Sequence, residues 1–98
     1  MLSIEDVRYY CSDDTIVLTN HLLNRIRQRH IQIEDIKNAI LNGKIIEQYP
    51  NDYPFPSCLI FSENMHIVCS IGEGYLYIIT AYRPSPEKWI DGKKRKEN

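Results

Sequence analysis

Three side chains suited to phosphate chemistry recur at a four-residue spacing, where His21, Arg25 and Arg29 stand at positions i, i+4 and i+8. On a helix this spacing places them along one stripe. An imidazole transfers protons near neutral pH, and a guanidinium matches the oxygens of a phosphate. Cleavage of a phosphodiester by side chains alone needs a base, an acid and cations around the phosphorane. The stripe could therefore supply one proton carrier and two phosphate clamps.

Later strand-like segments carry the other candidates. His66 begins an inner strand and is the second possible proton carrier. Thr80 and Tyr82 are two residues apart, so they project from the same face of a sheet. Tyr82 could stack on a base or donate to a phosphate. The candidate catalytic residues are thus His21, Arg25, Arg29, His66 and Tyr82, and the candidate substrate-binding residues are Thr80 and Tyr49.

Each candidate also has an ordinary structural interpretation. His21 could cap its helix or bond a carbonyl, and His66 could be a satisfied, half-buried histidine. Thr80 suits any strand, and Tyr49 is an ordinary strand aromatic unless its sheet face proves basic. These alternatives stay open from the sequence alone.

The two arginines have a structural alternative of their own. Arg25 and Arg29 could pair with Glu47 or Asp35 in an internal ion-pair network. In that case the stripe would stabilise the fold instead of binding an anion. The position of each guanidinium relative to solvent distinguishes the two interpretations.

Hydrophobic periodicity predicts two helices ahead of a sheet. Thr19 can cap a helix over residues 20–30, whose apolar side carries Leu22, Leu23 and Ile26. A second helix is expected over residues 33–42, with Gly43 as its stop. The short loop between them predicts a helix hairpin.

From Lys44 onward the apolar period changes to that of a strand. Strands are predicted over residues 45–49, 58–61, 66–71 and 75–82, and their short connections require antiparallel neighbours. The expected fold class is α+β, with the N-terminal helix hairpin packed on one face of a roughly four-stranded antiparallel sheet and the other face free.

The expected domain organisation is one domain with short ends. Residues 1–14 form an N-terminal extension whose weak apolar stripe is compatible with a short helix. A β-branched segment at residues 15–18 is compatible with a strand, and the domain spans residues 15–90. Residues 91–98 contain the run Lys93 to Lys96 and are expected to form a disordered basic tail.

Composition excludes several function classes. A net charge of −1 argues against a strong nonspecific grip on nucleic acid, so an RNA site needs a local basic patch. The three cysteines have no C-x-x-C spacing, so no metal site and no cofactor are expected, and Cys58 and Cys69, which sit inside apolar runs, are predicted to be small buried hydrophobic side chains. No apolar run approaches the roughly 20 residues of a membrane span, and we expect a cytoplasmic location.

Five segments, taken in order, resemble the bacterial domain-of-unknown-function family 4258. They are H-x3-R-x3-R from His21, I-x-x-E-D-I over residues 31–36, residues 43–50 with Pro56-Ser57, His66-Ile67-Val68, and residues 78–84 with Trp89. The chain departs from the family pattern at Arg29-His30-Ile31, where R-G-I is usual.

The resemblance implies the fold of the RelE and MqsR toxins, the barnase/colicin/RelE-like group. It implies a metal-independent mRNA endoribonuclease of a toxin–antitoxin pair, acting on RNA either free or on the ribosome. The implied protein partner is an antitoxin encoded nearby, of the zinc-finger type, so any zinc would belong to the partner.

Two other hypotheses remain. The mildly acidic balance and the missing glycine favour a non-catalytic module that binds a partner protein or RNA through the same face. In the weaker hypothesis of a purely structural domain, the His/Arg stripe is a buried polar network.

Overall fold

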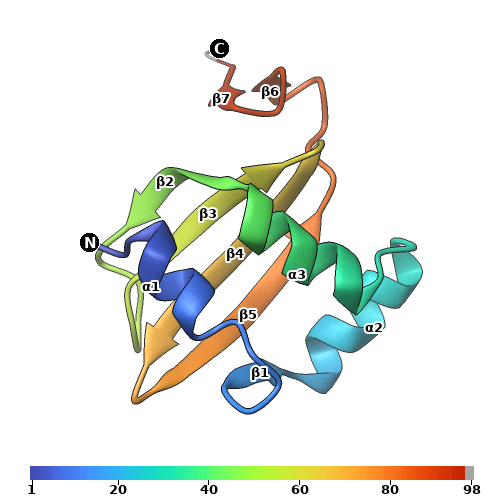
Figure 1. Ribbon diagram of the computed structural model, residues 1–98. Helices are drawn as coiled ribbons and strands as arrows, with labels where there is room; N and C mark the ends of the chain where they lie inside the picture. Colours follow the sequence, from blue (N-terminus) through green and yellow to red (C-terminus); the bar gives the residue numbers. More distant parts are fainter. Residues whose placement is uncertain (97–98) are drawn as a thin grey trace.

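The central element is a five-stranded mixed sheet in the computed structural model, which describes residues 1–96 (Figure 1). The strand order is β1-β5-β4-β3-β2, with β2 to β5 antiparallel and β1 parallel to β5. The bounds are Ile16–Leu18 for β1, Lys44–Tyr49 for β2, Ser57–Ser62 for β3, Met65–Gly72 for β4 and Tyr75–Tyr82 for β5. The α+β prediction is confirmed, and the short β-branched segment supplies the extra parallel edge strand.

Three helices cover one face of this sheet: α1 (Ile4–Tyr9), α2 (Asn20–Gln28) and α3 (Ile33–Asn42). α3 packs on β3 and β4, α1 packs on α3, and α2 lies beside β5 (Figure 1). The predicted cap of α2 is confirmed, since the Thr19 hydroxyl accepts the Leu22 N–H at 3.1 Å. Within residues 1–96 no helix is long and apolar enough to cross a membrane.

The core lies between the helices and alternate residues of the strands. Cys58 and Cys69 are fully buried, directly opposite each other on β3 and β4, with their sulfur atoms 3.8 Å apart. They are free thiols and pack as small apolar side chains, as predicted. The other strand and helix residues of this layer include Leu22, Ile26, Ile36, Ile40, Ile60, Ile67 and Ile78.

The N-terminal segment, predicted as an extension, contributes to the same core. Val7 on α1 is fully buried. Arg8 donates to the carbonyl oxygens of Ile40 and Gly43 at 3.2 and 3.0 Å, where α3 ends. Gln48 on β2 exchanges hydrogen bonds with the backbone of Leu2. Residues 1–14 are therefore built into the domain instead of preceding it.

The junction between α2 and α3 explains how the chain manages without a glycine. His30 adopts a left-handed conformation with φ of 57°. Its N–H bonds the Arg27 carbonyl at 3.2 Å, and the Ile31 N–H bonds the Ile26 carbonyl at 2.8 Å. These two bonds define a Schellman motif, whose left-handed residue is usually glycine. The helix end is kept, and His30 carries the strain of a side chain at positive φ.

The opposite sheet face, expected to be free, is covered at both ends. At one end Phe55 stacks on Tyr77 with ring centroids 6.0 Å apart. At the other, residues 89–95 form a small hairpin of β6 (Trp89–Ile90) and β7 (Lys94–Arg95), seen beyond the end of the sheet in Figure 1. The expected disordered tail is thus partly folded, because Trp89 is buried against the sheet. Residues 97–98 of that tail lie outside the described residues.

Candidate functional site

His66, the second residue of β4, lies near one end of the sheet, on the face opposite the helices. It lies directly across from Phe61 on β3 and Tyr82 on β5, and its side chain is fully buried. The ring meets those of Tyr82 and Trp89 edge-on, with centroids 5.3 and 4.4 Å away. Trp89 comes from the C-terminal hairpin, so His66 joins the sheet to that hairpin.

Both ring nitrogens of His66 have hydrogen-bond partners. Nε2 lies 2.5 Å from the Gly92 carbonyl oxygen, and Nδ1 lies 3.3 Å from the Tyr82 hydroxyl. Because a carbonyl can only accept, Nε2 carries the proton, and Nδ1 of the neutral ring accepts from Tyr82. Burial lowers the pKa of His66 and outweighs the opposing effect of the Gly92 bond. The imidazole is therefore neutral at pH 7, in one defined tautomer.

A second polar group surrounds Glu47 on β2. The Tyr49 hydroxyl donates to Glu47 Oε1 at 2.5 Å, and Arg95 Nε lies 3.0 Å from Oε2. The Arg95 guanidinium also lies over the Trp89 ring, 4.6 Å from its centroid. Burial acts to raise the pKa of Glu47. The hydrogen bonds from Tyr49 and Arg95 together outweigh this effect, so the pKa lies below its ordinary value. Burial and the Glu47 bond raise the pKa of Tyr49 to about 12.

These two groups form one site, named here the His66 cluster. The charges of Glu47 and Arg95 act on the pKa of both His66 and Tyr82, which places all four side chains in one electrostatic environment. Burial is the largest influence on Tyr82 and raises its pKa. At neutral pH the cluster thus contains an ionised carboxylate, a guanidinium, a neutral imidazole and protonated phenols. Its members are Glu47, Tyr49, His66, Tyr82, Trp89 and Arg95.

Arg29 and Thr80 border the cluster at the sheet edge. Strand β1 pairs only with Leu76, Tyr77 and Ile78 of β5, which leaves the later part of that edge without a strand partner. Arg29 takes this place by donating to the Thr80 hydroxyl at 3.2 Å and to the Ala81 carbonyl at 2.9 Å. Arg29 therefore has a positioning role at the edge of β5, and Thr80 is held by it.

Glu47 and Asp35, considered from the sequence as ion-pair partners of Arg25 and Arg29, have other partners in the structure. Glu47 pairs with Arg95, and Arg29 bonds β5 instead. Asp35 accepts the N–H of Gln32 at 2.9 Å, in the capping box that starts α3. A carboxylate in the first turn of a helix is already favoured by the helix dipole.

Two of the predicted site residues do not belong to the His66 cluster. His21 and Arg25 are exposed on α2, a helix of the opposite layer. Neighbouring strand residues point to opposite faces, and Ile67 faces the helices, so His66 faces away from them. The structure thus unites His66, Tyr82 and Tyr49, with Arg29 and Thr80 alongside, and leaves His21 and Arg25 outside.

Sequence reasoning did not select Glu47 or Arg95 as site residues. Glu47 and Tyr49 are two residues apart on one strand, which was a usable signal for a shared face. Arg95 lies in the basic run that was expected to be disordered, so the sequence carried no comparable signal for it.

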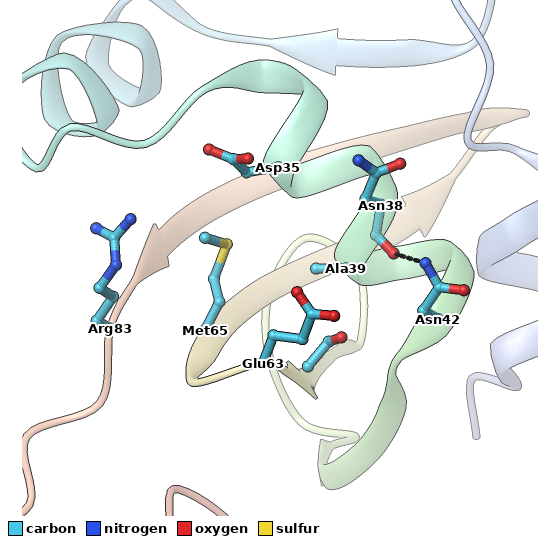
Figure 2. A pocket seen from close by; sticks show the side chains of 8 residues that line it. Asp35, Asn38, Ala39, Asn42, Glu63, Met65 and Arg83 are labelled. Carbon is cyan, nitrogen blue, oxygen red and sulfur yellow. Dashed lines mark hydrogen bonds between the residues drawn. The ribbon is translucent and has the colours of Figure 1, made fainter.

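A separate polar hollow of about 510 Å³ lies between α3, the β3–β4 turn and the end of β5 (Figure 2). Figure 2 shows Asp35 and Asn38 on one side and Arg83 and Glu63 on the others. None of the residues singled out from the sequence as catalytic or substrate-binding lines it. The His66 cluster is therefore the better candidate site.

Comparisons with known proteins identify a family. Residues 18–83 match the family model described as "Domain of unknown function (DUF4258)". No curated protein and no solved structure matches the chain. The matched segment includes Glu47, His66 and Tyr82 and excludes the hairpin residues Trp89 and Arg95. Because the match covers more than half of the chain, this protein belongs to the DUF4258 family.

Proposed function

We propose that this protein is a metal-independent endoribonuclease of the toxin–antitoxin type, with the His66 cluster as its reaction centre. The observation that carries the proposal is the meeting of an ionised Glu47, a Tyr82–His66 pair and the Arg95 guanidinium on one sheet face. Membership of family 4258, whose resemblance implies the fold of the RelE and MqsR toxins, supports the same activity, with RNA as substrate and a zinc-finger antitoxin as partner.

Each step of RNA cleavage has a candidate residue. The Glu47 carboxylate takes the proton of the ribose 2′-OH, and O2′ attacks the adjacent phosphorus. The bond to O5′ breaks, and Tyr82 donates its proton to that oxygen. The products are a 2′,3′-cyclic phosphate and a 5′-hydroxyl. The protonated Glu47 then releases its proton to water and Tyr82 regains one from water, so both residues return to their starting states. Arg95 stabilises the charge of the phosphorane.

The Glu47–Arg95 pair links substrate binding to activation of the base. A phosphate that binds Arg95 replaces Glu47 as the partner of the guanidinium. The carboxylate, whose side chain is 24% exposed, then accepts a proton more readily because it has lost a cation. The resting pair therefore keeps the base protected until an anion arrives.

Incubation of purified protein with RNA, free and on ribosomes, tests the proposal. Cleavage should persist with a chelator and leave 2′,3′-cyclic ends. Glu47→Gln and Tyr82→Phe should each lower the rate about 100-fold or more. Glu73→Gln, in the exposed β4–β5 turn, is the matched control and should cleave normally. Absence of cleavage by wild type on both substrates, or full activity of Glu47→Gln, overturns the proposal.

A second candidate is a non-catalytic module that binds RNA or a partner protein through the same face. It is favoured by the complete burial of His66 and by the mutual satisfaction of Glu47 and Arg95. Expression in cells distinguishes the two candidates. Growth arrest that the neighbouring gene relieves supports the enzyme, and harmless expression with retained binding supports the module.

A further inference from the structure

The charge of this chain is distributed unevenly. Residues 1–87 contain seven Lys or Arg and eleven Asp or Glu. Residues 88–96 contain five Lys or Arg and one Asp. The mildly negative total therefore conceals one strongly positive segment. An electrostatic footprint for a nucleic acid is a local cluster of this kind, whatever the net charge of the protein.

The positive segment is folded. Trp89 is 5% exposed, β6 pairs with β7, and the Lys96 N–H bonds the Lys88 carbonyl at 2.8 Å. The five cations Lys88, Lys93, Lys94, Arg95 and Lys96 are all exposed. They are held on one compact hairpin, so their charges add at a defined place instead of dispersing along a mobile tail.

Two contacts fix the hairpin to the His66 cluster on the sheet. The Gly92 carbonyl accepts from His66, and Arg95 pairs with Glu47. The half-buried rings of Tyr49 and Tyr82 belong to the same cluster. Cations beside aromatic side chains are the combination that single-stranded nucleic acids bind, through the phosphate backbone and base stacking.

We propose that residues 88–96 form a backbone-binding element for single-stranded RNA, which leads the phosphates to the His66 cluster. This inference rests on the proposed function for its substrate class. The hairpin lies outside residues 18–83, the segment that matches the DUF4258 family model.

The test separates binding from cleavage by using a labelled 12-nucleotide 2′-O-methyl RNA, which lacks the attacking hydroxyl. Fluorescence anisotropy at several salt concentrations gives the affinity and its salt dependence. Lys94→Gln/Lys96→Gln should weaken binding about tenfold or more at low salt and reduce the slope of log affinity against log salt by about 1.4. Arg27→Gln/Lys37→Gln removes two cations from the helices and should leave both nearly unchanged. An unchanged emission of Trp89 verifies that the hairpin is folded.

Each outcome is decisive. The inference is overturned if the two double variants lose RNA affinity equally, or if neither loses any. Competition by polyglutamate as strong as by unlabelled oligonucleotide also overturns it and indicates an acidic protein ligand instead. Binding that depends on Lys94 and Lys96 without any cleavage of natural RNA upholds the inference while the proposed nuclease fails. If natural RNA is cleaved equally well with and without Lys94 and Lys96, the proposed nuclease stands and the inference about the hairpin fails.

Discussion

The Nε2 nitrogen of His66 lies 2.5 Å from the backbone carbonyl oxygen of Gly92, 26 positions further along the chain. This bond joins an inner strand to the turn of the C-terminal hairpin. It defines the imidazole tautomer, and through Nδ1 it also orients the Tyr82 hydroxyl. The same contact therefore couples the folding of the hairpin to the protonation of the candidate site.

Protonation of His66 should weaken the fold. Since burial lowers its pKa below 6.5, the unfolded chain binds the proton more readily than the folded protein. The free energy of unfolding should therefore fall as the pH decreases from about 7.5 to 5. Urea titrations at several pH values measure this dependence. His66→Gln should flatten it in this window, and an equal slope in the variant would contradict the assignment. Glu47, whose pKa is also lowered, contributes below about pH 4.5.

Gly92→Ala should detach the hairpin. An added Cβ would lie 2.5 Å from Cε1 of Phe61, and Gly92 has φ of 74°. Strain and overpacking together should cost about 2 kcal/mol. Trp89 is the only tryptophan of the chain, so its emission should shift to longer wavelength when it meets water.

Gly74→Ala is the matched control for Gly92→Ala. Gly74 has φ of 86° but no atom within 4 Å of an added Cβ. Gly74→Ala should lower the free energy of unfolding through backbone strain alone, without a change in Trp89 emission. A red shift of equal size in both variants would rule out the contact with Phe61 as the cause.

His30→Gly should stabilise the protein. His30 has φ of 57° at the end of α2, where glycine avoids the Cβ penalty. We expect a gain of about 1 kcal/mol, or a rise in Tm of about 5 °C. His21→Gly, the same exchange within the helix, should instead lose a few tenths of a kcal/mol. Thermal unfolding of the two variants measures the difference, and a loss in both would exclude the Schellman interpretation.

The three cysteines should differ in reactivity. Cys58 and Cys69 are fully buried, whereas Cys11 is half-buried. A thiol-specific reagent should modify at most one thiol per native chain and three after unfolding. Burial raises the pKa of Cys11, so its reaction should accelerate with pH. Cys11→Ser should abolish the native reaction, and rapid modification of two thiols in that variant would show that the core opens.

Local patterns were sufficient to predict most of the secondary structure. The helix over residues 33–42 and the strand over residues 75–82 have the predicted bounds, and the strands predicted over residues 45–49, 58–61 and 66–71 differ by at most one residue at each end. These elements depend on side-chain periodicity, caps and turn residues within a few positions of one another. The sequence placed Thr80 and Tyr82 on one sheet face, whereas the pairing of His66 with Tyr82 came from the register of β4 and β5 in the structure.

Only the tertiary structure decided how the site is assembled. Glu47 and Arg95 are 48 positions apart, and no local pattern indicates that they meet. Arg95 reaches Glu47 because Trp89 and Gly92 hold the hairpin against His66, and this docking depends on ring packing and on a glycine with room for Phe61. The same run of lysines without these anchors would remain a solvated tail. Its position depends on contacts between residues distant in the chain, which composition and periodicity do not encode.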